Sequence, residues 1–465
     1  MTRFILFLSC LGALVSIAGE AGAQAYQQQC SAGNGQACFE AGRTMGETPQ
    51  GFALFMQSCN FNHMPGCNEA AWRMEHGRGV AVNLQQAVAL YNRACQGGYM
   101  LGCANLGLMY RNARGVPQDD VMSANLSRRA CDGGDAGGCN DLGYMYQHGR
   151  GVPQNDGQAS AYYQRACQGS FMAGCNDLAW MYERGRGVPM DIVRAAALYR
   201  QACDGNYMLS CNNLGLFYRS GRGVPRDDVQ AAALHRRSCL GGEASGCADL
   251  GFMYQHGRGV PQSDAQACTY YQQACTGSHG GGCNDLGWMY EMGRGVPQND
   301  QQAASLYNQG CDLGEMLGCN NLGLLYRNGR GVPRDDVRAA QLHRQACDGG
   351  ELGACVDLGY MFQNGRGVPQ SDVQASANYR RACDGGDSGG CNDLAWMYER
   401  GRGVPLSLVD AVNLYQRACD GNHMLGCENL GLMYQSGTGV PLDITRARAL
   451  FQRACAGGQT SACSR

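Results

Sequence analysis

The feature that most constrains this chain is a strict 36-residue repeat marked by cysteine. From Cys131 to Pro153, two cysteines eight residues apart are followed by a short apolar pattern and then by Gly-Arg-Gly-Val-Pro. The first cysteine of this unit recurs, with no insertion or deletion, at Cys59, Cys95, Cys131, Cys167, Cys203, Cys239, Cys275, Cys311, Cys347, Cys383, Cys419 and Cys455. A unit this small buries its apolar face only by stacking on its neighbours. The period therefore predicts one elongated array.

Of the 28 cysteines, 26 form thirteen pairs with the same eight-residue spacing. One pair, Cys30 and Cys38, precedes the array, and the second members of the others are Cys67, Cys103, Cys139, Cys175, Cys211, Cys247, Cys283, Cys319, Cys355, Cys391, Cys427 and Cys463. Regular pairing in an exported protein indicates disulfides, and local pairing is favoured. The competing interpretation is a metal array. It is disfavoured because the spacing is not Cys-x-x-Cys and no histidines stand at ligand spacing nearby.

Each unit has the pattern of two helices. Small and apolar residues follow Cys139 at helical spacing, and Gly149 and Gly151 are placed to end that first helix. A second helix carries Ala159, Tyr163 and Ala166 on one face. The pattern predicts an all-α fold, an α/α solenoid of helix-turn-helix repeats, each closed by a local disulfide. Gly143 in the first helix indicates that the two helices approach closely, since a glycine there otherwise costs roughly 1 kcal/mol.

The start of the second helix is marked two residues after the proline. Helix-capping residues occupy this position at Asp119, Asn155, Asp191, Asp227, Ser263, Asn299, Asp335, Ser371, Ser407 and Asp443. The side chains of such residues accept a hydrogen bond from a free backbone N–H of the first turn.

The two ends of the chain differ from the array. Residues 1–25 have the pattern of a signal peptide, with Arg3, an apolar run and small residues before the cleavage site, although an uncleaved anchor is the alternative. Residues 26–58 are predicted to be an atypical N-terminal capping repeat, and residues 59–465 the array itself. No later segment is apolar enough to span a membrane. We expect a secreted or periplasmic protein with no membrane span after signal cleavage.

Composition excludes several functions. The net charge of −2 makes nucleic-acid binding unfavourable, because phosphate recognition needs a clustered basic surface. The chain has no lysine, which excludes Walker-A, Schiff-base and Ser-x-x-Lys chemistry. No metal-binding histidine motif and no nucleophile elbow occurs, so the residues predict no catalytic, metal or cofactor site.

A longer period of 108 residues, three units, runs through the first helices. It places tryptophan at Trp72, Trp180, Trp288 and Trp396, and alternating charges that include Glu183, Arg219, Glu291 and Arg327. Duplication of three-unit blocks is by itself sufficient to explain this period. The functional interpretation is a candidate binding surface, because aromatic residues and arginine are enriched at binding hot spots. Glu183 and Arg219 are a candidate ion pair between neighbouring units.

Cys268 stands outside the pairs, where other units have Ala232, Ala304 or Ser160. It is interpreted as a free, packed thiol, with a reactive or dimer-forming thiol as the alternative.

The turns and the Leu-Gly-x-Met-Tyr pattern of the first helix resemble Sel1-like repeats, which are related to tetratricopeptide repeats. The cysteine spacing resembles the Helicobacter cysteine-rich protein subfamily. The resemblance covers about residues 30–463 and implies a right-handed superhelix that serves as an exported scaffold for a protein or peptide ligand. For the subfamily it also implies an alternative, a hydrolase that binds β-lactams or cell-wall-related small molecules without the serine or zinc motifs.

Overall fold

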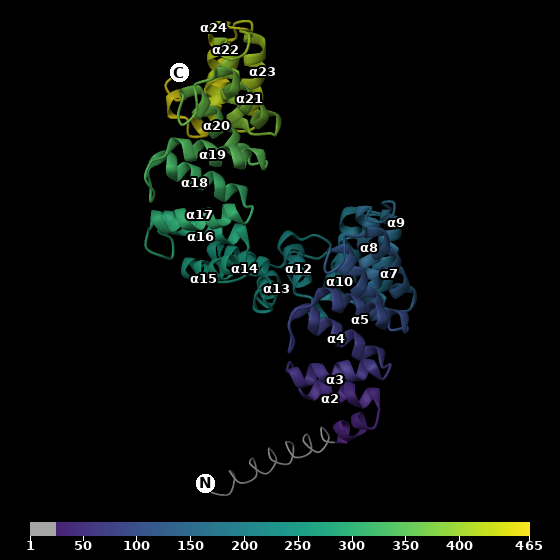
Figure 1. The fold of residues 1–465 in the computed structure, drawn as a ribbon. Helices are drawn as coiled ribbons and strands as arrows, with labels where there is room; N and C mark the ends of the chain where they lie inside the picture. The colour runs from purple at the N-terminus through teal and green to yellow at the C-terminus, as the bar shows by residue number, and fades with distance from the viewer. Residues whose placement is uncertain (1–24) are drawn as a thin grey trace, which may run out of the picture. The chain divides into compact units, whose positions relative to one another are not determined.

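The structure is a computed structural model that describes residues 25–465. The predicted signal peptide therefore lies almost wholly outside the described residues. The described chain consists of helices and turns, as predicted, and divides into two units, residues 25–227 and 228–465 (Figure 1). Within residues 25–465, no helix combines the length and the apolar character needed to cross a membrane.

The helices of the first unit alternate between the first and second helix of a repeat. They are α2 (Gly35–Thr44), α3 (Pro49–Asn60), α4 (Met64–His76), α5 (Leu84–Gln96), α6 (Met100–Arg111), α7 (Asp120–Asp132), α8 (Ala136–His148), α9 (Asp156–Gln168), α10 (Met172–Arg184), α11 (Ile192–Asp204) and α12 (Met208–Ser220). The predicted capping repeat, residues 26–58, contains α2 and most of α3.

The second unit continues the alternation. Its elements are α13 (Asp228–Leu240), α14 (Ala244–His256), α15 (Asp264–Thr276), α16 (Gly280–Met292), α17 (Asp300–Asp312), α18 (Met316–Asn328), α19 (Asp336–Asp348), α20 (Leu352–Asn364), α21 (Asp372–Asp384), α22 (Ser388–Arg400), α23 (Leu408–Asp420), α24 (Met424–Ser436), α25 (Ile444–Ala456) and the 3₁₀ turn η1 (Thr460–Ala462).

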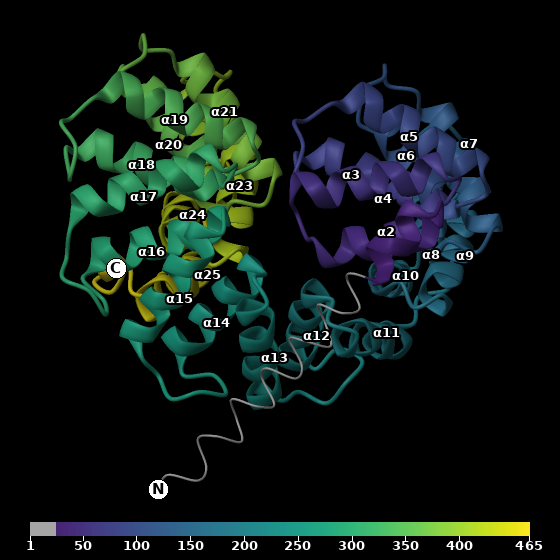
Figure 2. The same ribbon diagram turned by 60° about the horizontal axis from the view of Figure 1, so that its bottom comes forward.

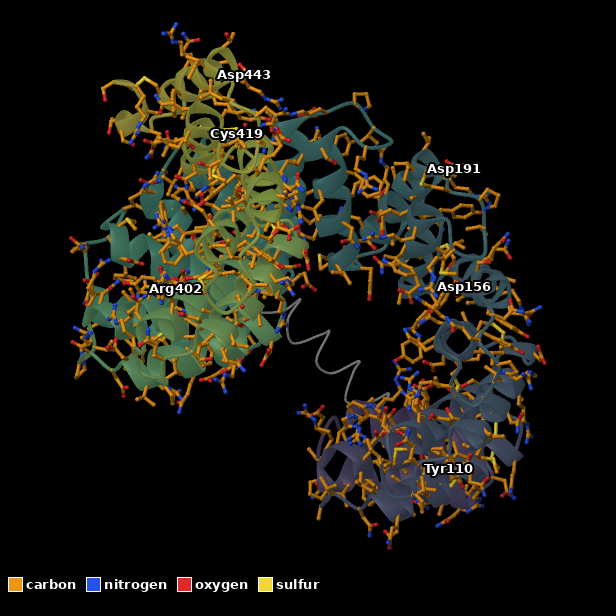
Figure 3. All side chains as sticks on the ribbon, turned by 90° about the horizontal axis from the view of Figure 1, so that it is seen from above. Tyr110, Asp156, Asp191, Arg402, Cys419 and Asp443 are labelled. Atoms are coloured by element: carbon orange, nitrogen blue, oxygen red, sulfur yellow. A yellow bond between two sulfur atoms is a disulfide. The ribbon has the colours of Figure 1, made fainter. Side chains whose placement is uncertain are left out.

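The capping residues begin the second helices as predicted. The side chain of Asp191 accepts from the backbone N–H of Arg194 at 2.9 Å, and that of Asp443 from Arg446 at 2.9 Å (both aspartates are labelled in Figure 3). Equivalent caps begin α7, α9, α15, α17, α19, α21 and α23. Gly149, with φ of +65°, ends α8 in the left-handed conformation that glycine adopts without strain.

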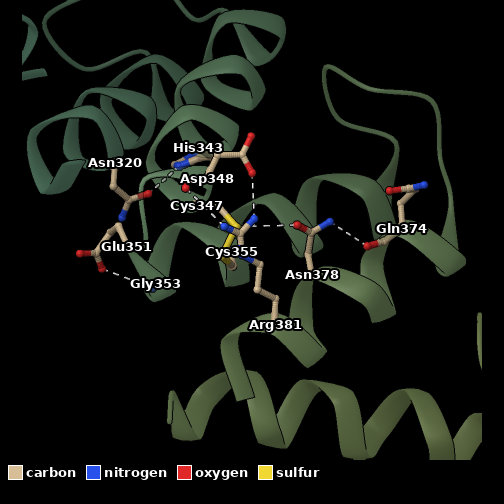
Figure 4. The surroundings of a disulfide bond; sticks show 10 residues. All are labelled: Asn320, His343, Cys347, Asp348, Glu351, Gly353, Cys355, Gln374, Asn378 and Arg381. Carbon is tan, nitrogen blue, oxygen red and sulfur yellow. Dashed lines mark hydrogen bonds and ion pairs between the residues drawn. A yellow bond between two sulfur atoms is a disulfide. The ribbon is translucent and has the colours of Figure 1, made fainter. Parts of the chain in front are cut away.

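Thirteen disulfides join the predicted cysteine pairs, from Cys30–Cys38 to Cys455–Cys463. The Cα atoms of each pair lie 4.4–4.8 Å apart. From Cys59–Cys67 to Cys419–Cys427, each bond ties the end of one second helix to the start of the next first helix, as Figure 4 shows for Cys347 and Cys355. Beside that bond Arg381 pairs with Asp348 at 2.8 Å. The last bond ties α25 to Cys463, directly after η1. Because every bond is local, each one stabilises its own junction between repeats.

Each Gly-Arg-Gly-Val-Pro turn packs on the second helix of the preceding repeat. The guanidinium of Arg366 donates to both carboxylate oxygens of Asp336, at 3.4 and 2.8 Å. Asp156 and Arg402 belong to two further pairs of this kind, with Arg186 and Asp372 (Figure 3). A Cβ at Gly367, φ +67°, would lie only 1.9 Å from the carbonyl oxygen of Asp336. Glycine is therefore required where turn and helix meet.

In most repeats a buried ring of the second helix packs against a small residue of the first helix, and in the repeat of α6 and α7 Ser127 takes the place of the ring. Tyr163 is 1 % exposed, and a Cβ at Gly143 would lie 2.7 Å from its ring, which confirms the predicted close approach. The hydroxyl of Tyr163 donates to Gln147 at 2.6 Å, so its polar end is satisfied. Within each unit the first helices of successive repeats also contact each other, as α14 and α16 do. The first helices therefore lie on the inner side of the curved path that Figure 2 shows for each unit.

Candidate functional site

The four predicted tryptophans lie on the first helices α4, α10, α16 and α22, and each is half-buried. An arginine of the following turn lies over the ring in three of them, with Cζ 5.4 Å from the ring centroid of Trp180, 5.3 Å from Trp288 and 5.2 Å from Trp396. Trp72 instead stacks on His76 at 4.7 Å. One face of each ring is thus supported, while part of the side chain stays open to solvent.

Two of these tryptophans line hollows in the second unit that we call the tryptophan hollows. The first is about 510 Å³ in volume and is lined by Phe252, Gln255, His256, Tyr271, Asn284, Asp285, Trp288, Arg294, Leu317 and Asn321. The second is about 390 Å³ and is lined by Tyr360, Gln363, Tyr379, Asn392, Asp393, Trp396, Leu425 and Asn429. Every residue of the second hollow has its counterpart 108 residues earlier in the first. Both have the volume of small-ligand sites.

Asparagines connect neighbouring first helices at these hollows. Asn321 donates to the side-chain oxygen of Asn284 at 2.9 Å, and Asn284 donates in turn to Asp285 at 3.3 Å. The same chain joins Asn429, Asn392 and Asp393, at 2.9 and 3.1 Å. These hydrogen bonds fix the polar groups of both hollows in place.

The aspartates of the hollows carry a charge that no cation of the described residues compensates by an ion pair. Burial raises the pKa of Asp285 to about 6, although the hydrogen bond from Asn284 and the nearby His279 lower it. Glu315 and Asp249 raise the pKa further. Burial likewise raises the pKa of Asp393. Both carboxylates are desolvated groups held beside an aromatic ring.

Replacing this charge with a neutral amide should stabilise the fold. The folded-state pKa of Asp285 exceeds its unfolded value, so its carboxylate lowers stability progressively as pH rises from about 4 to about 6, and fully above that range. Asp285→Asn should therefore raise the free energy of unfolding by up to roughly 2–3 kcal/mol near neutral pH and change it little near pH 4. Asn321 already occupies the equivalent position, so an amide fits there. Urea unfolding at both pH values measures the effect.

The control for this prediction is Asp357→Asn. Asp357 occupies the equivalent position in α20 but forms an ion pair with Arg327 at 2.7 Å. Removing the carboxylate of Asp357 leaves the partly buried guanidinium of Arg327 without its partner, so this variant should be less stable near neutral pH. A destabilising Asp285→Asn would contradict the interpretation of Asp285 as an uncompensated charge.

Glu183, one of the predicted surface charges, contacts residues of its own repeat and of the turn in the next repeat. Glu183 accepts from the hydroxyl of Tyr199 at 3.0 Å and pairs with Arg222 at 3.0 Å, while the pairing with Arg219 stays a prediction. Arg222 belongs to the Gly-Arg-Gly-Val-Pro turn, and the position 30 residues before it holds Ile192 in place of the usual aspartate. Arg219 lines a separate hollow of about 500 Å³ that also contains Trp180 and Glu183.

In the second unit, Glu291 likewise accepts from Tyr307 at 2.7 Å and pairs with the turn residue Arg330 at 2.8 Å. Arg327 pairs forward with Asp357, as noted above, and Arg111 pairs with Asp141 at 3.1 Å in the first unit. Of the predicted surface residues, Trp180, Trp288 and Trp396 therefore line open hollows, while Glu291 and Arg327 form contacts between repeats.

Cys268 is a free thiol, 6 % exposed, whose Sγ donates to the backbone carbonyl of Arg294 at 3.3 Å. Burial raises the pKa of this thiol, which disfavours the reactive thiolate. These observations fit the packed-thiol interpretation.

Sequence reasoning missed the asparagines and aspartates of the hollows. A signal was present in the two residues that follow the second cysteine of a pair. They read Asn-Asp at Asn140, Asn176, Asn284 and Asn392, and the last three of these repeats carry tryptophan. In these three repeats the aspartate and the tryptophan stand three residues apart, which places them on one face of the first helix.

Comparison with known proteins agrees with this architecture. The Sel1 repeat model matches eleven consecutive segments between residues 65 and 459. A structure of c5321, described as a protective antigen of uropathogenic Escherichia coli strains with an SLR fold, is 26% identical with a TM-score of 0.59, covering 89% of this chain and 88% of that one. A Sel1 repeat protein from Oxalobacter formigenes is 25% identical with a TM-score of 0.49, covering 70% of this chain and 93% of that one.

Helicobacter pylori cysteine rich protein B is 30% identical with a TM-score of 0.24, covering 28% of this chain and 94% of that one. A comparison with curated proteins found no match. The family match runs through nearly the whole described array, repeat by repeat. The chain belongs to the Sel1 repeat family.

Proposed function

We propose that the chain is an exported scaffold that binds a partner protein or peptide along the first helices of its repeats. The observation that carries the proposal is the pair of tryptophan hollows, which combine a half-buried ring, fixed asparagines and an exposed leucine. Concave sites with mostly apolar walls and a few fixed polar groups are typical of binding sites. Sel1 repeat proteins typically mediate contacts between proteins.

Export is supported by the thirteen disulfides, because such bonds persist in an oxidising compartment such as the periplasm or the extracellular space. No observation on the described residues favours the β-lactam hydrolase alternative or a role in binding nucleic acid. Binding of a protein or peptide is therefore the function proposed.

The test is site-specific photo-crosslinking on the full oxidised chain in the exported fraction of its host. A crosslinker replaces Leu425, which lines a tryptophan hollow and is 40 % exposed, or Val409, which is 62 % exposed on the second helix α23. We expect a discrete crosslinked product from position 425 and none from position 409. Equal products from both positions, or none from 425, would contradict the proposed binding face.

A further inference from the structure

The tryptophan hollows repeat an arrangement that binds arginine elsewhere in the same chain. In α20, Asp357 pairs with Arg327 of the preceding first helix at 2.7 Å, and the Cζ of that arginine lies 5.7 Å from the ring centroid of Tyr360. Asp141 and Tyr144 hold Arg111 in the same way, at 3.1 and 5.1 Å. An aspartate and the aromatic residue three positions later therefore form a guanidinium site in this fold.

The same pair is present in both hollows, with tryptophan in place of tyrosine. Asp285 precedes Trp288, and Asp393 precedes Trp396, with the same three-residue spacing. What differs is the residue 30 positions upstream, which is Arg327 for Asp357 but Gln255 for Asp285 and Gln363 for Asp393. The carbonyl oxygens of the glutamines accept from Tyr271 and Tyr379 at 2.6 and 2.8 Å. The chain thus supplies an arginine to Asp141 and Asp357, but a neutral glutamine stands at the corresponding position for Asp285 and Asp393.

The charges around the hollows support a cationic occupant. Asp393 is the one charged residue that lines the second hollow. The first hollow also contains His256 and Arg294, but the guanidinium of Arg294 is bound to both carboxylate oxygens of Asp264, at 3.0 and 2.9 Å. Burial raises the pKa of both aspartates because it disfavours the charged carboxylate, and a cation paired with that carboxylate would offset this cost.

We propose that each of the two tryptophan hollows receives an arginine side chain of the bound protein or peptide, whose guanidinium pairs with Asp285 or Asp393 beside the tryptophan. The inference rests on the proposed binding function and specifies the ligand chemistry. Tryptophan gives the strongest cation–π interaction of the aromatic residues. The asparagines that bind each aspartate hold it in position.

The probes are pools of short peptides, capped at both ends, with one fixed central residue and uncharged residues elsewhere. The fixed residue is arginine, its neutral isostere citrulline, or lysine. The full oxidised chain should bind the arginine pool about tenfold more tightly than the citrulline pool, which corresponds to a charge-assisted hydrogen bond. The double variant Asp285→Asn/Asp393→Asn should reduce the affinity for the arginine pool to that for citrulline.

The matched control is Asp348→Asn/Asp384→Asn, which removes the same two charges from exposed second-helix positions and should leave the preference for arginine unchanged. Equal binding of arginine and citrulline, with crosslinking at position 425 intact, would overturn this inference and leave the proposed function standing. Tighter binding of the lysine pool would overturn the assignment of arginine. Absence of binding by every pool would count against the inference, and loss of crosslinking as well would count against the proposed function.

Discussion

Alanine in place of Gly367 is expected to destabilise the second unit by about 3 kcal/mol or more, among the largest effects of single substitutions. Two causes combine. The φ of +67° is unfavourable for a residue with a Cβ, at roughly 1–2 kcal/mol. The Cβ would also lie 1.9 Å from the carbonyl oxygen of Asp336, so the turn would have to move off α19 and weaken the Arg366–Asp336 pair. Urea unfolding followed by circular dichroism measures the loss.

Gly350→Ala is the matched control. Gly350 has φ of +98°, and a Cβ added there meets nothing within 4 Å. This variant has the backbone strain without the steric clash, so its free energy of unfolding should fall by only about 1–2 kcal/mol. Equal losses in the two variants would show that the close approach of turn and helix contributes nothing to stability.

Removing one disulfide is the second change with a large expected effect. Cys347→Ala/Cys355→Ala opens a loop of nine residues and should lower the free energy of unfolding by roughly 2–3 kcal/mol in the chain-entropy model. Because the array gains its stability from neighbouring repeats, the loss should be concentrated in α19 and α20. Hydrogen exchange, resolved by peptide, should show faster exchange there than at α24.

Cys268→Ala is the control for the disulfide variant. Its thiol forms no disulfide, and alanine occupies the equivalent positions 232 and 304. We expect unchanged exchange throughout the chain. Faster exchange spread evenly over the second unit of the Cys347/Cys355 variant would contradict the local action of the bond.

Much of the fold is predictable because its determinants lie close together in the sequence. Asp191 caps the helix that follows it directly, and Cys347 pairs with a cysteine eight residues away. A glycine in the middle of a helix lowers stability, so Gly143 indicates that a neighbouring side chain occupies the space of its missing Cβ. That side chain is the ring of Tyr163. Each of these features can be predicted from the sequence of a single repeat.

The contacts between repeats were harder to predict because they depend on where side chains of adjacent units meet. Arg366 reaches Asp336 across 30 residues, a spacing that helical periodicity does not reveal. Glu183 and Arg219 occupy equivalent positions one unit apart, yet Glu183 contacts the turn residue Arg222. The hollow around Asp285 combines residues from α14, α15, α16 and α18, so its outline required the packed structure.

The disulfide pattern also bears on how such a chain is made and how it evolves. Within the array, cysteines pair in the order in which they leave the ribosome, and the buried Cys268 is the exception to that order. An oxidase that joins each new cysteine to the one before it would produce the native pattern without reshuffling, except where Cys268 intervenes. Duplication or deletion of a whole 36-residue unit leaves every remaining cysteine with its partner, so the array can change length without any change in its oxidative folding.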